Sequence, residues 1–312
     1  MKLALDYKII DKPKIAKPFL KWAGGKTQLL GQFDGFFPEE LKENKIEKYF
    51  EPFIGSGAVF FHILQDYSIK KSFINDSNEE LIHVYQVIKN DVNNLIETLK
   101  KIKEHYFNLS ESKRPDYYYQ VRKDYNKNKS NNKIYSKTWI LKAAQLIFLN
   151  KTCFNGLFRI NNKGEFNVPF GKYRNPKILD KENLIAVSLL LQNVIIEAKD
   201  FTVIRNKVDK DSFVYFDPPY RPISPTSNFT SYTKDNFSER DQLRLAKLFK
   251  ELDKTGAKLM LSNSDPNNGN HNGNFFETIY KGFNIYRVNA KRMINCDASK
   301  RGHIKELVIT NY

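Results

Sequence analysis

The sequence predicts an α/β fold, in which a mostly parallel, doubly wound sheet is built from both ends of the chain. Short apolar or alternating runs recur before residue 80 and after residue 190, and most end in polar, Gly or Pro residues, as strands do. Amphipathic helical patterns separate several of these runs, and strands that alternate with helices form parallel sheets. Between the two groups the alternation breaks, which predicts an inserted, mainly helical domain.

The predicted strands are short and are bounded by polar or turn-forming residues. Their ranges are 48–53, 71–76, 194–200, 213–218, 258–264, 284–290 and 305–312. The clearest helix covers 238–256, where Ser238 and Asp241 form a capping pattern and Gly256 ends the helix. Its leucines form one stripe at helical spacing: Leu243, Leu245, Leu248 and Leu252.

The middle of the chain has a different character. Residues 79–102 and 137–150 are predicted helices, because their apolar residues recur every three or four positions. The segment between them, 111–133, is rich in lysine and interleaved with tyrosine. After the second helix, the Asn-Asn-Lys-Gly stretch at 161–164 separates two alternating runs and predicts a β-hairpin.

These patterns divide the chain into a discontinuous sheet domain, residues 1–82 and 194–312, and an inserted domain, residues 83–193. A chain of 312 residues is long enough for one core with an inserted second domain. The polar, glycine-containing stretch at 267–274 predicts a loop.

The net charge of +16, from 51 basic and 35 acidic residues, predicts attraction to a polyanion such as nucleic acid. The richness in lysine is equally typical of an AT-rich genome, so this reading depends on the motifs below. A hydrophobic content of 41% predicts a globular protein, and the chain has no apolar run long enough for a membrane span.

The N-terminal segment and the cysteines indicate a cytoplasmic protein without a membrane partner. The first residues carry scattered charges and no continuous apolar core, so we do not expect a secretory signal. Cys153 and Cys296 have no partner spacing, which favours free thiols. The five histidines form no ligand pattern with each other or with cysteine, so we predict no metal.

A glycine-bearing turn directly follows the predicted strand at 48–53. Gly55 and Gly57 allow close approach of the backbone to a ligand, and the following helix offers free N–H groups. The next predicted strand ends in Asp76. In dinucleotide-binding folds an acidic residue that binds the ribose hydroxyls stands about 20 residues after the glycine turn, and Asp76 has this spacing. Asp76 could equally cap the helix that begins after it.

A second glycine turn, Gly25-Lys26-Thr27, has the end of a P-loop but lacks its first glycine, because Leu20 stands there. An ATPase reading therefore loses its main support. Trp22 and Lys26 remain candidates to contact a ligand, as an aromatic wall and as a cation. The alternative is that Trp22 lies in the core and Lys26 on the surface.

The stretch SFVYFDPPYRPIS, 212–224, ends a buried strand in a carboxylate, two prolines and an aromatic residue. Because proline cannot donate to a sheet ladder, the strand stops at Asp217. Ligands of α/β sheets bind at such strand ends. Asp217, Pro218, Pro219 and Tyr220 are therefore either a site or an ordinary proline-terminated strand.

Taken in order, FLKWAGGKTQLL, YFEPFIGSGAVFF, IND, FNGLFRINNKGEFNVPFGKY and YFDPPYRPIS resemble the DNA adenine methylase (Dam) family over nearly the whole chain. The resemblance is nearest to GATC-modifying adenine methylases of Dpn- and Mbo-type restriction–modification systems. It implies a Rossmann-like, S-adenosylmethionine-dependent methyltransferase sheet with an inserted, mainly helical DNA-recognition domain that carries a β-hairpin. It also implies S-adenosylmethionine as methyl donor, double-stranded DNA as substrate, and a cognate restriction endonuclease as functional partner.

The resemblance assigns roles residue by residue. The implied S-adenosylmethionine contacts are Trp22, Lys26, Glu51, Pro52, Phe53, Gly55, Gly57, Asp76 and Asp217. The implied catalytic corner is Asp217, Pro218, Pro219 and Tyr220. In this reading the Asp217 carboxylate and the Pro218 carbonyl accept hydrogen bonds from the adenine amino group, while Tyr220 stacks on a base that has left the duplex.

The inserted domain is implied to read the DNA sequence. Arg159 matches an arginine that reads a guanine, and Lys21 matches a lysine that contacts the outer guanine. Phe154 matches an aromatic wedge, Leu157 and Pro169 match apolar base contacts, and Asn155 matches a phosphate contact. For Phe154, Leu157 and Pro169 the alternative role is packing in the core of the hairpin. We expect the lysine–tyrosine segment, 113–133, to make nonspecific phosphate contacts.

Other activities remain open at this level. An RNA adenine-N6 methyltransferase could share the D-P-P-Y corner, and methylation of cytosine N4 could use similar chemistry. A DNA-binding module that has lost catalysis is the alternative outside the enzymes. The intact Asp217 and the intact Gly55–Gly57 turn favour an active enzyme over that module.

Overall fold

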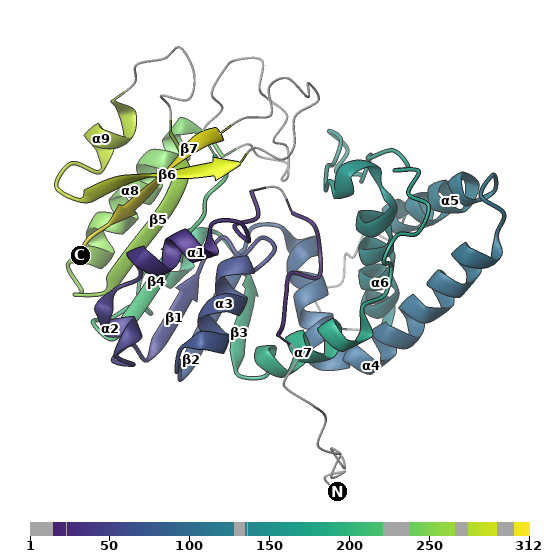
Figure 1. The fold of residues 1–312 in the computed structure, drawn as a ribbon, viewed down its shortest axis with the longest axis horizontal. Coiled ribbons are helices and arrows are strands. Elements are labelled where there is room, and N and C mark those ends of the chain that lie inside the picture. Colours follow the sequence, from purple (N-terminus) through teal and green to yellow (C-terminus); the bar gives the residue numbers. More distant parts are fainter. Residues whose placement is uncertain are drawn as a thin grey trace, which may run out of the picture.

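The computed structural model describes residues 15–22, 24–127, 135, 137–220, 237–265, 274–291 and 303–312. These residues form a seven-stranded sheet with helices on both faces, and a lobe of helices beside it (Figure 1). The strands are β1 (Lys48–Glu51), β2 (Lys71–Asp76), β3 (Val194–Ala198), β4 (Ser212–Phe216), β5 (Lys258–Ser264), β6 (Asn284–Lys291) and β7 (His303–Thr310). They coincide with the predicted strands to within a few residues, so the α/β prediction is confirmed.

The strand order is β3-β2-β1-β4-β5-β7-β6, and only β7 runs antiparallel to its neighbours. The parallel pairs are β1 with β2 and β4, β2 with β3, and β4 with β5. From β1 the chain goes to β2 on one side, and β4 later pairs on the other side of β1. The carboxyl ends of β1 and β4 therefore flank the point where the strand order reverses, which is where open α/β sheets bind ligands.

Helices connect the strands and build the adjoining lobe. Their bounds are α1 (Leu30–Phe33), η1 (Asp34–Phe36), α2 (Glu39–Lys42), α3 (Ala58–Asp66), α4 (Glu79–Asn108), α5 (Arg114–Lys127), α6 (Lys137–Thr152), η2 (Phe154–Gly156), α7 (Lys181–Leu191), η3 (Phe201–Ile204), α8 (Glu239–Asp253) and α9 (Phe275–Ile279). Ser238 and Asp241 form the capping box that the sequence predicts at the start of α8, with both reciprocal hydrogen bonds present.

Helix α4 joins the sheet to the helical lobe. Its first half packs against the sheet edge, where Lys89 Nζ donates to the Val194 carbonyl at 2.6 Å. The helix kinks at Asp91, whose backbone is non-helical, and along its length it also packs against α6 and α7. The buried apolar side chains of the lobe are continuous with those on one face of the sheet. The domain boundaries at 82/83 and 193/194 remain a proposal.

Alternation along the central strands sends neighbouring side chains to opposite faces of the sheet. On β1, Tyr49 belongs to the apolar cluster shared with the lobe, and Phe50 belongs to the cluster under α8 and α9. On β4, Tyr215 and Phe216 divide in the same way. As a result Glu51 and Asp217, two residues beyond these tyrosines, point to the same face.

The predicted hairpin is present in the lobe. Ile160 pairs with Phe166 in antiparallel fashion, and the Asn161 amide donates to the Glu165 carbonyl at 2.9 Å. Gly164 adopts a φ of 71°, which the turn requires and which glycine adopts without a Cβ penalty. Of the predicted loop at 267–274, all but Asn274 lies outside the described residues.

The described helices include none with enough length and apolar character to cross a bilayer.

Candidate active site

A cleft of about 880 Å³ opens at the carboxyl ends of the central strands. It is bordered by the turn after β1, the loop after β2, the corner after β4 and the hairpin of the lobe. All the residues assigned to catalysis, and all those assigned to the cofactor except Gly57, line this one cleft: Trp22, Lys26, Glu51, Pro52, Phe53, Gly55, Asp76, Asp217, Pro218, Pro219 and Tyr220.

Glycine is required in the turn after β1 for two different reasons. Gly55 and Gly57 have φ values of 45° and 74°, in the left-handed region that favours glycine. A Cβ on Gly57 would lie 2.7 Å from the Tyr85 hydroxyl oxygen, so a side chain cannot fit there. Gly57 precedes the first turn of α3 and fixes the direction in which that helix starts.

Asp76 fastens the end of β2 to this turn. Its carboxylate accepts from the Gly55 amide at 3.2 Å and from the Asn78 amide at 2.9 Å. Burial raises the pKa of Asp76 to about 6, although these amide donors oppose the shift. The cap of α4 is Asn78, whose side chain accepts from the Leu81 amide at 3.0 Å. Asp76 is therefore available to a ligand rather than committed to capping α4.

Lys26 and Asp217 form an ion pair in the cleft. The Lys26 ammonium lies 2.8 Å from each carboxylate oxygen of Asp217 and donates to the Gly24 carbonyl at 2.5 Å. Lys26 is only 3% exposed, so the pair is largely shielded from water. Burial raises the pKa of Asp217, and the charge of Lys26 acts in the opposite direction. Ser262 also donates to this carboxylate at 3.1 Å.

A second carboxylate lies beneath this pair. Glu51 is buried at the end of β1 and accepts a hydrogen bond from the Tyr49 hydroxyl at 2.6 Å. Burial raises the pKa of Glu51 well above its usual value, and the nearby negative charge of Asp217 adds to the shift. The cleft therefore concentrates carboxyl groups around the buried ammonium of Lys26.

The Pro-Pro-Tyr part of the corner is held from neighbouring elements. The Pro219 carbonyl accepts from the Gln242 side chain on α8 at 3.3 Å. The Tyr220 hydroxyl donates to Glu306 on β7 at 2.6 Å, and the Lys26 ammonium lies 4.6 Å from the centroid of the Tyr220 ring. Pro218 lines the cleft between these anchored residues.

Sequence reasoning identified Phe53 but missed Phe201 and Phe237, which form an aromatic wall of the cleft with it. Phe201 stacks on Phe53 with centroids 5.4 Å apart, and Phe237 packs against both rings. Arg244 lies over Phe201, 4.9 Å from its centroid. Aromatic rings beside polar groups are typical of a small-molecule site.

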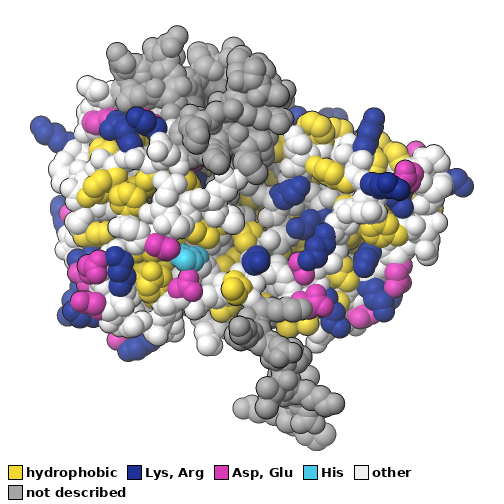
Figure 2. Space-filling model, viewed as in Figure 1, with side chains coloured by type: hydrophobic (Ala, Val, Ile, Leu, Met, Phe, Trp, Pro, Cys, Tyr) yellow, Lys and Arg dark blue, Asp and Glu magenta, His cyan; other side chains and the backbone are white. Residues whose placement is uncertain are grey.

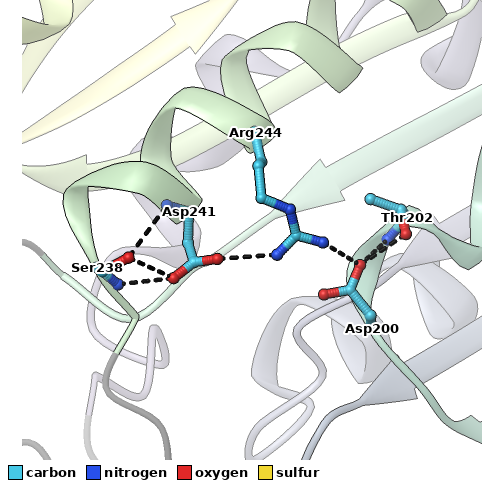
Figure 3. A network of polar contacts seen from close by, with 5 residues as sticks. All are labelled: Asp200, Thr202, Ser238, Asp241 and Arg244. Carbon is cyan, nitrogen blue, oxygen red and sulfur yellow. Dashed lines mark hydrogen bonds and ion pairs between the residues drawn. The ribbon is translucent and has the colours of Figure 1, made fainter.

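Arg244 also bridges two carboxylates at this wall (Figure 3). It donates to Asp200 at 3.0 Å and to Asp241 at 2.8 Å, and Asp241 is held in turn by Ser238 in the α8 capping box. Asp200 accepts from the Thr202 hydroxyl at 2.6 Å. Asp200 is the last residue of the predicted strand 194–200, as Asp76 is the last residue of β2. This shared position at a strand end is the sequence signal that could have identified Asp200.

The residues assigned to DNA binding do not line the cleft, and most are gathered beside it on the lobe. Phe154 is 50% exposed, and its amide donates to the Pro169 carbonyl at 2.8 Å. Asn155 and Pro169 are exposed, and Leu157 is half-buried. The alternative role in hairpin core therefore fails for Phe154 and Pro169. Lys21 packs on the neighbouring turn, where a Cβ on Gly156 would meet its side chain.

Arg159 lies on the hairpin with its guanidinium fixed. Its Nε donates to the Asn167 side-chain oxygen at 2.8 Å, which leaves donors at the far end of the fork for another acceptor. The hairpin residue Phe158 stacks on Trp22 with centroids 5.0 Å apart. This stack connects the DNA-binding candidates to the cleft.

The lysine–tyrosine segment divides between surface and core. Within α5, Tyr118 and Tyr125 are buried. Tyr118 anchors the hairpin by donating to the Val168 carbonyl at 2.8 Å, whereas Tyr125 donates to Glu80 on α4 at 3.0 Å. Residues 128–134 lie outside the described residues. On the face shown in Figure 2, Lys and Arg side chains are spread over both the lobe and the sheet rather than gathered in one patch.

Comparisons with known proteins place the chain in one family. Residues 22–294 match the family model described as D12 class N6 adenine-specific DNA methyltransferase. The chain is 56% identical over 297 residues to the type II methyltransferase M.MjaIII of Methanocaldococcus jannaschii, covering 95% of this chain and 99% of the relative. It is 40% identical to the type II methyltransferase M1.LlaDCHI of Lactococcus lactis subsp. cremoris, covering 97% and 99%.

A third relative, the DNA adenine methylase of Haemophilus influenzae, is 34% identical over 298 residues, covering 95% of this chain and 94% of the relative. The seven-stranded α/β sheet is consistent with a methyltransferase that uses S-adenosylmethionine. The chain therefore belongs to the family of D12 class N6 adenine-specific DNA methyltransferases, which implies S-adenosylmethionine as methyl donor and double-stranded DNA as substrate.

Proposed function

We propose that this enzyme methylates the adenine of GATC in duplex DNA and protects host DNA in a restriction–modification system. The catalytic part of this proposal rests on one observation. The Asp217–Tyr220 corner, the turn that contains Gly55, and Asp76 all border the same cleft. A donor and an extruded base can therefore meet in a single space. The volume of about 880 Å³ lies within the range of about 300–1,000 Å³ that is usual for ligand sites.

The residues present fit S-adenosylmethionine. The Asp76 carboxylate would accept ribose hydroxyls, the Gly55 and Gly57 turn would let the backbone approach, and Phe53 would pack against the purine. Glu51, Pro52 and Trp22 would complete the wall, with the Glu51 carboxyl as a polar contact. When bound, S-adenosylmethionine supplies an electrophilic methyl group on a sulfonium. Lys26 pairs with Asp217 at 2.8 Å, and we therefore propose that it contributes by holding the charge and position of that carboxylate.

Asp217 and Pro218 would activate the target amine. The lone pair of adenine N6 is delocalised into the ring, which makes it a poor nucleophile. Hydrogen bonds from its two N–H groups to the Asp217 carboxylate and the Pro218 carbonyl favour a pyramidal nitrogen whose lone pair is free to attack. A carboxylate has lone pairs enough to accept from Lys26, from Ser262 and from the amine. As the N–C bond forms, the S–C bond of the donor would break with its electron pair left on sulfur, and the Asp217 carboxylate would accept the proton that the nitrogen then loses.

Most of the DNA contacts in this proposal belong to the lobe, whereas Tyr220 and Lys21 lie outside it. Tyr220 would stack on the extruded adenine, and Phe154 would fill the space that the base leaves in the duplex. Arg159 would read a guanine through O6 and N7, and Lys21 the outer guanine. Leu157 and Pro169 would contact bases, and Asn155 a phosphate. The hairpin's resemblance to GATC readers supports the recognition sequence.

The names of two relatives support the proposed biological role. Two of the relatives are named type II methyltransferases, a term for the modification enzymes of type II restriction systems. This supports a cognate restriction endonuclease as a functional partner, with no requirement that the two proteins touch.

Expression in a host that lacks DNA methylation tests the proposal, with modified bases mapped across the genome. We expect N6-methyladenine in GATC on both strands, resistance of that DNA to a GATC endonuclease, and no modification with Asp217→Ala. Modification at another sequence would reject the recognition proposal. N4-methylcytosine, or methylation of RNA in place of DNA, would reject the assignment of the acceptor.

A further inference from the structure

Tyr220 is held at two places by residues from distant parts of the chain. Its hydroxyl donates to the Glu306 carboxylate at 2.6 Å, from a position 86 residues away. The Lys26 ammonium lies over the ring, 4.6 Å from the centroid. One contact fixes the tip of the side chain and the other covers one face of the ring.

Glu306 is an unusual residue for its place in the fold. It lies in β7, which is antiparallel to β5 and β6, and it is only 8% exposed. A buried carboxylate costs free energy unless hydrogen bonds compensate it. Burial raises the pKa of Glu306, and the nearby charge of Asp217 raises it further, while Lys26 and the hydroxyl of Tyr220 oppose the shift. An apolar residue at this position would avoid the cost, so we expect the Glu306 carboxylate to have a function.

We propose that Glu306 is a positioning residue that, together with Lys26, holds the Tyr220 ring in place, so that the target base stacks on the face opposite Lys26. The proposal rests on the methylation of an extruded adenine proposed above. A tyrosine ring turns about two bonds, and stacking requires both to be fixed. The hydrogen bond to Glu306 holds the hydroxyl and so fixes rotation about the Cα–Cβ bond. Rotation about the Cβ–Cγ bond is restricted by the ammonium of Lys26 over one face of the ring and by the phenolic O–H, which points at its acceptor in the plane of the ring.

Loss of this hydrogen bond should impair extrusion and methyl transfer while leaving S-adenosylmethionine binding intact. A hydrogen bond to a charged group of this kind corresponds to an effect of about 10-fold on the rate. The effect should appear in kcat and in the stability of the extruded state, because Glu306 is not among the residues that line the cleft.

The test compares Tyr220→Phe, Glu306→Ala, Glu306→Gln and the double variant Tyr220→Phe/Glu306→Ala in the full chain. The DNA is a duplex with 2-aminopurine at the target adenine, whose fluorescence rises when the base leaves the stack. We expect Tyr220→Phe and Glu306→Ala each to lower kcat and the fluorescence rise about 10-fold. The double variant should be no worse than either single variant. Glu306→Gln should retain near wild-type values, because its amide can still hydrogen-bond the hydroxyl.

The matched control is Tyr135→Phe, which removes a tyrosine–carboxylate hydrogen bond of the same 2.6 Å length, from Tyr135 to Asp91 in the lobe. It should change neither kcat nor fluorescence. Additive losses in the double variant, or no rescue by Glu306→Gln, would overturn the positioning role. Should Glu306→Ala fail to fold, the Gln and Phe variants still decide the question. If the wild type does not methylate adenine at all, the proposed function fails instead.

Discussion

The ammonium of Lys26 lies 2.8 Å from both carboxylate oxygens of Asp217, although 191 positions separate the two residues. Lys26 comes from the segment before β1, and Asp217 follows the last residue of β4. Another Lys–Asp pair lies near the amino ends of β1 and β4, between Lys48, the first residue of β1, and Asp209, which precedes β4, and both of its side chains are substantially exposed. The two pairs have the same chemistry but only the first lies in the cleft, which makes the second a natural control.

Asp217→Ala should abolish most methyl transfer and leave DNA binding in place. The carboxylate would act as a preorganised acceptor for the amine, and removal of one such group costs about 2–4 kcal/mol of transition-state stabilisation. Single-turnover methylation and DNA affinity measure the two effects separately. Asp209→Ala, which breaks the outer pair, should retain the wild-type rate. Normal turnover in Asp217→Ala would refute the catalytic assignment.

Lys26→Met should move the acid limb of the pH–rate profile to higher pH. Burial raises the pKa of Asp217, and the charge of Lys26 opposes that rise. Without Lys26 the pKa of Asp217 climbs further, so a larger fraction of the carboxyl is protonated and inactive near neutrality. The profile of kcat from about pH 5 to about pH 9 shows the shift. Lys48→Met should leave the profile unchanged, and an unmoved acid limb in Lys26→Met would contradict the proposed pairing role.

Asp76→Asn should weaken S-adenosylmethionine binding and remove its pH dependence. Burial raises the pKa of Asp76 to about 6, so the wild-type carboxyl becomes ionised, and able to accept from ribose hydroxyls, as the pH rises through that value. Calorimetric titration should show wild-type affinity rising from pH 5 to pH 7, whereas affinity in Asp76→Asn stays low and flat. A wild-type affinity that does not change over this range would exclude Asp76 as the ionising contact.

The same variant should gain stability relative to the wild type as the pH rises. The folded-state pKa of Asp76 lies above its usual 3.8, so the folded protein binds more protons than the unfolded chain between about pH 4 and pH 6. Wild-type stability therefore falls over that window, and a neutral Asn avoids the loss. Thermal unfolding of the ligand-free proteins should show a difference that grows up to about pH 6 and then levels off. A constant difference would assign the raised pKa to another group.

Arg159→Ala should relax discrimination at one base pair of the recognition site. A bidentate arginine–guanine contact is worth about 1–3 kcal/mol of discrimination against the wrong base. Methylation rates on duplexes with single substitutions in the site measure the loss position by position. Arg205→Ala, which removes an arginine paired with Glu251 on the surface, is the control. Uniform weakening on all duplexes would make Arg159 a backbone contact.

The local chemistry of the site was predictable from the sequence, because each motif is contained in a few adjacent residues. The Pro-Pro pair ends β4 at once, since neither proline can donate to the ladder, and this fixes Asp217 at a strand end. The turn after β1 requires glycine for its left-handed conformations, so Gly55 and Gly57 were visible in the same way. The capping box of α8 is also local, with its two members three residues apart.

The roles of individual side chains were harder to predict when their partners lie far away. The resemblance assigned both Lys26 and Asp217 to the cofactor, and only the structure shows that the two side chains form an ion pair with each other. Glu306 carried no sequence signal, because a glutamate in an alternating strand is expected to face water. The aromatic wall of Phe53, Phe201 and Phe237 combines residues from separate elements, and only their convergence shows it.

The sequence by itself determined the strands, the glycine turn and the carboxylate–proline corner, because these depend on alternation, backbone freedom and ring geometry within a few residues. Only the tertiary structure decided which of these strand ends and turns border the same cleft, and which charged side chains meet in it. The reason is the strand order: parallel neighbours such as β1 and β4 are joined by 160 residues of chain in between. The two strands pair because their pairing buries both faces of the sheet, and no pattern of neighbouring residues in the sequence shows which strands will pair.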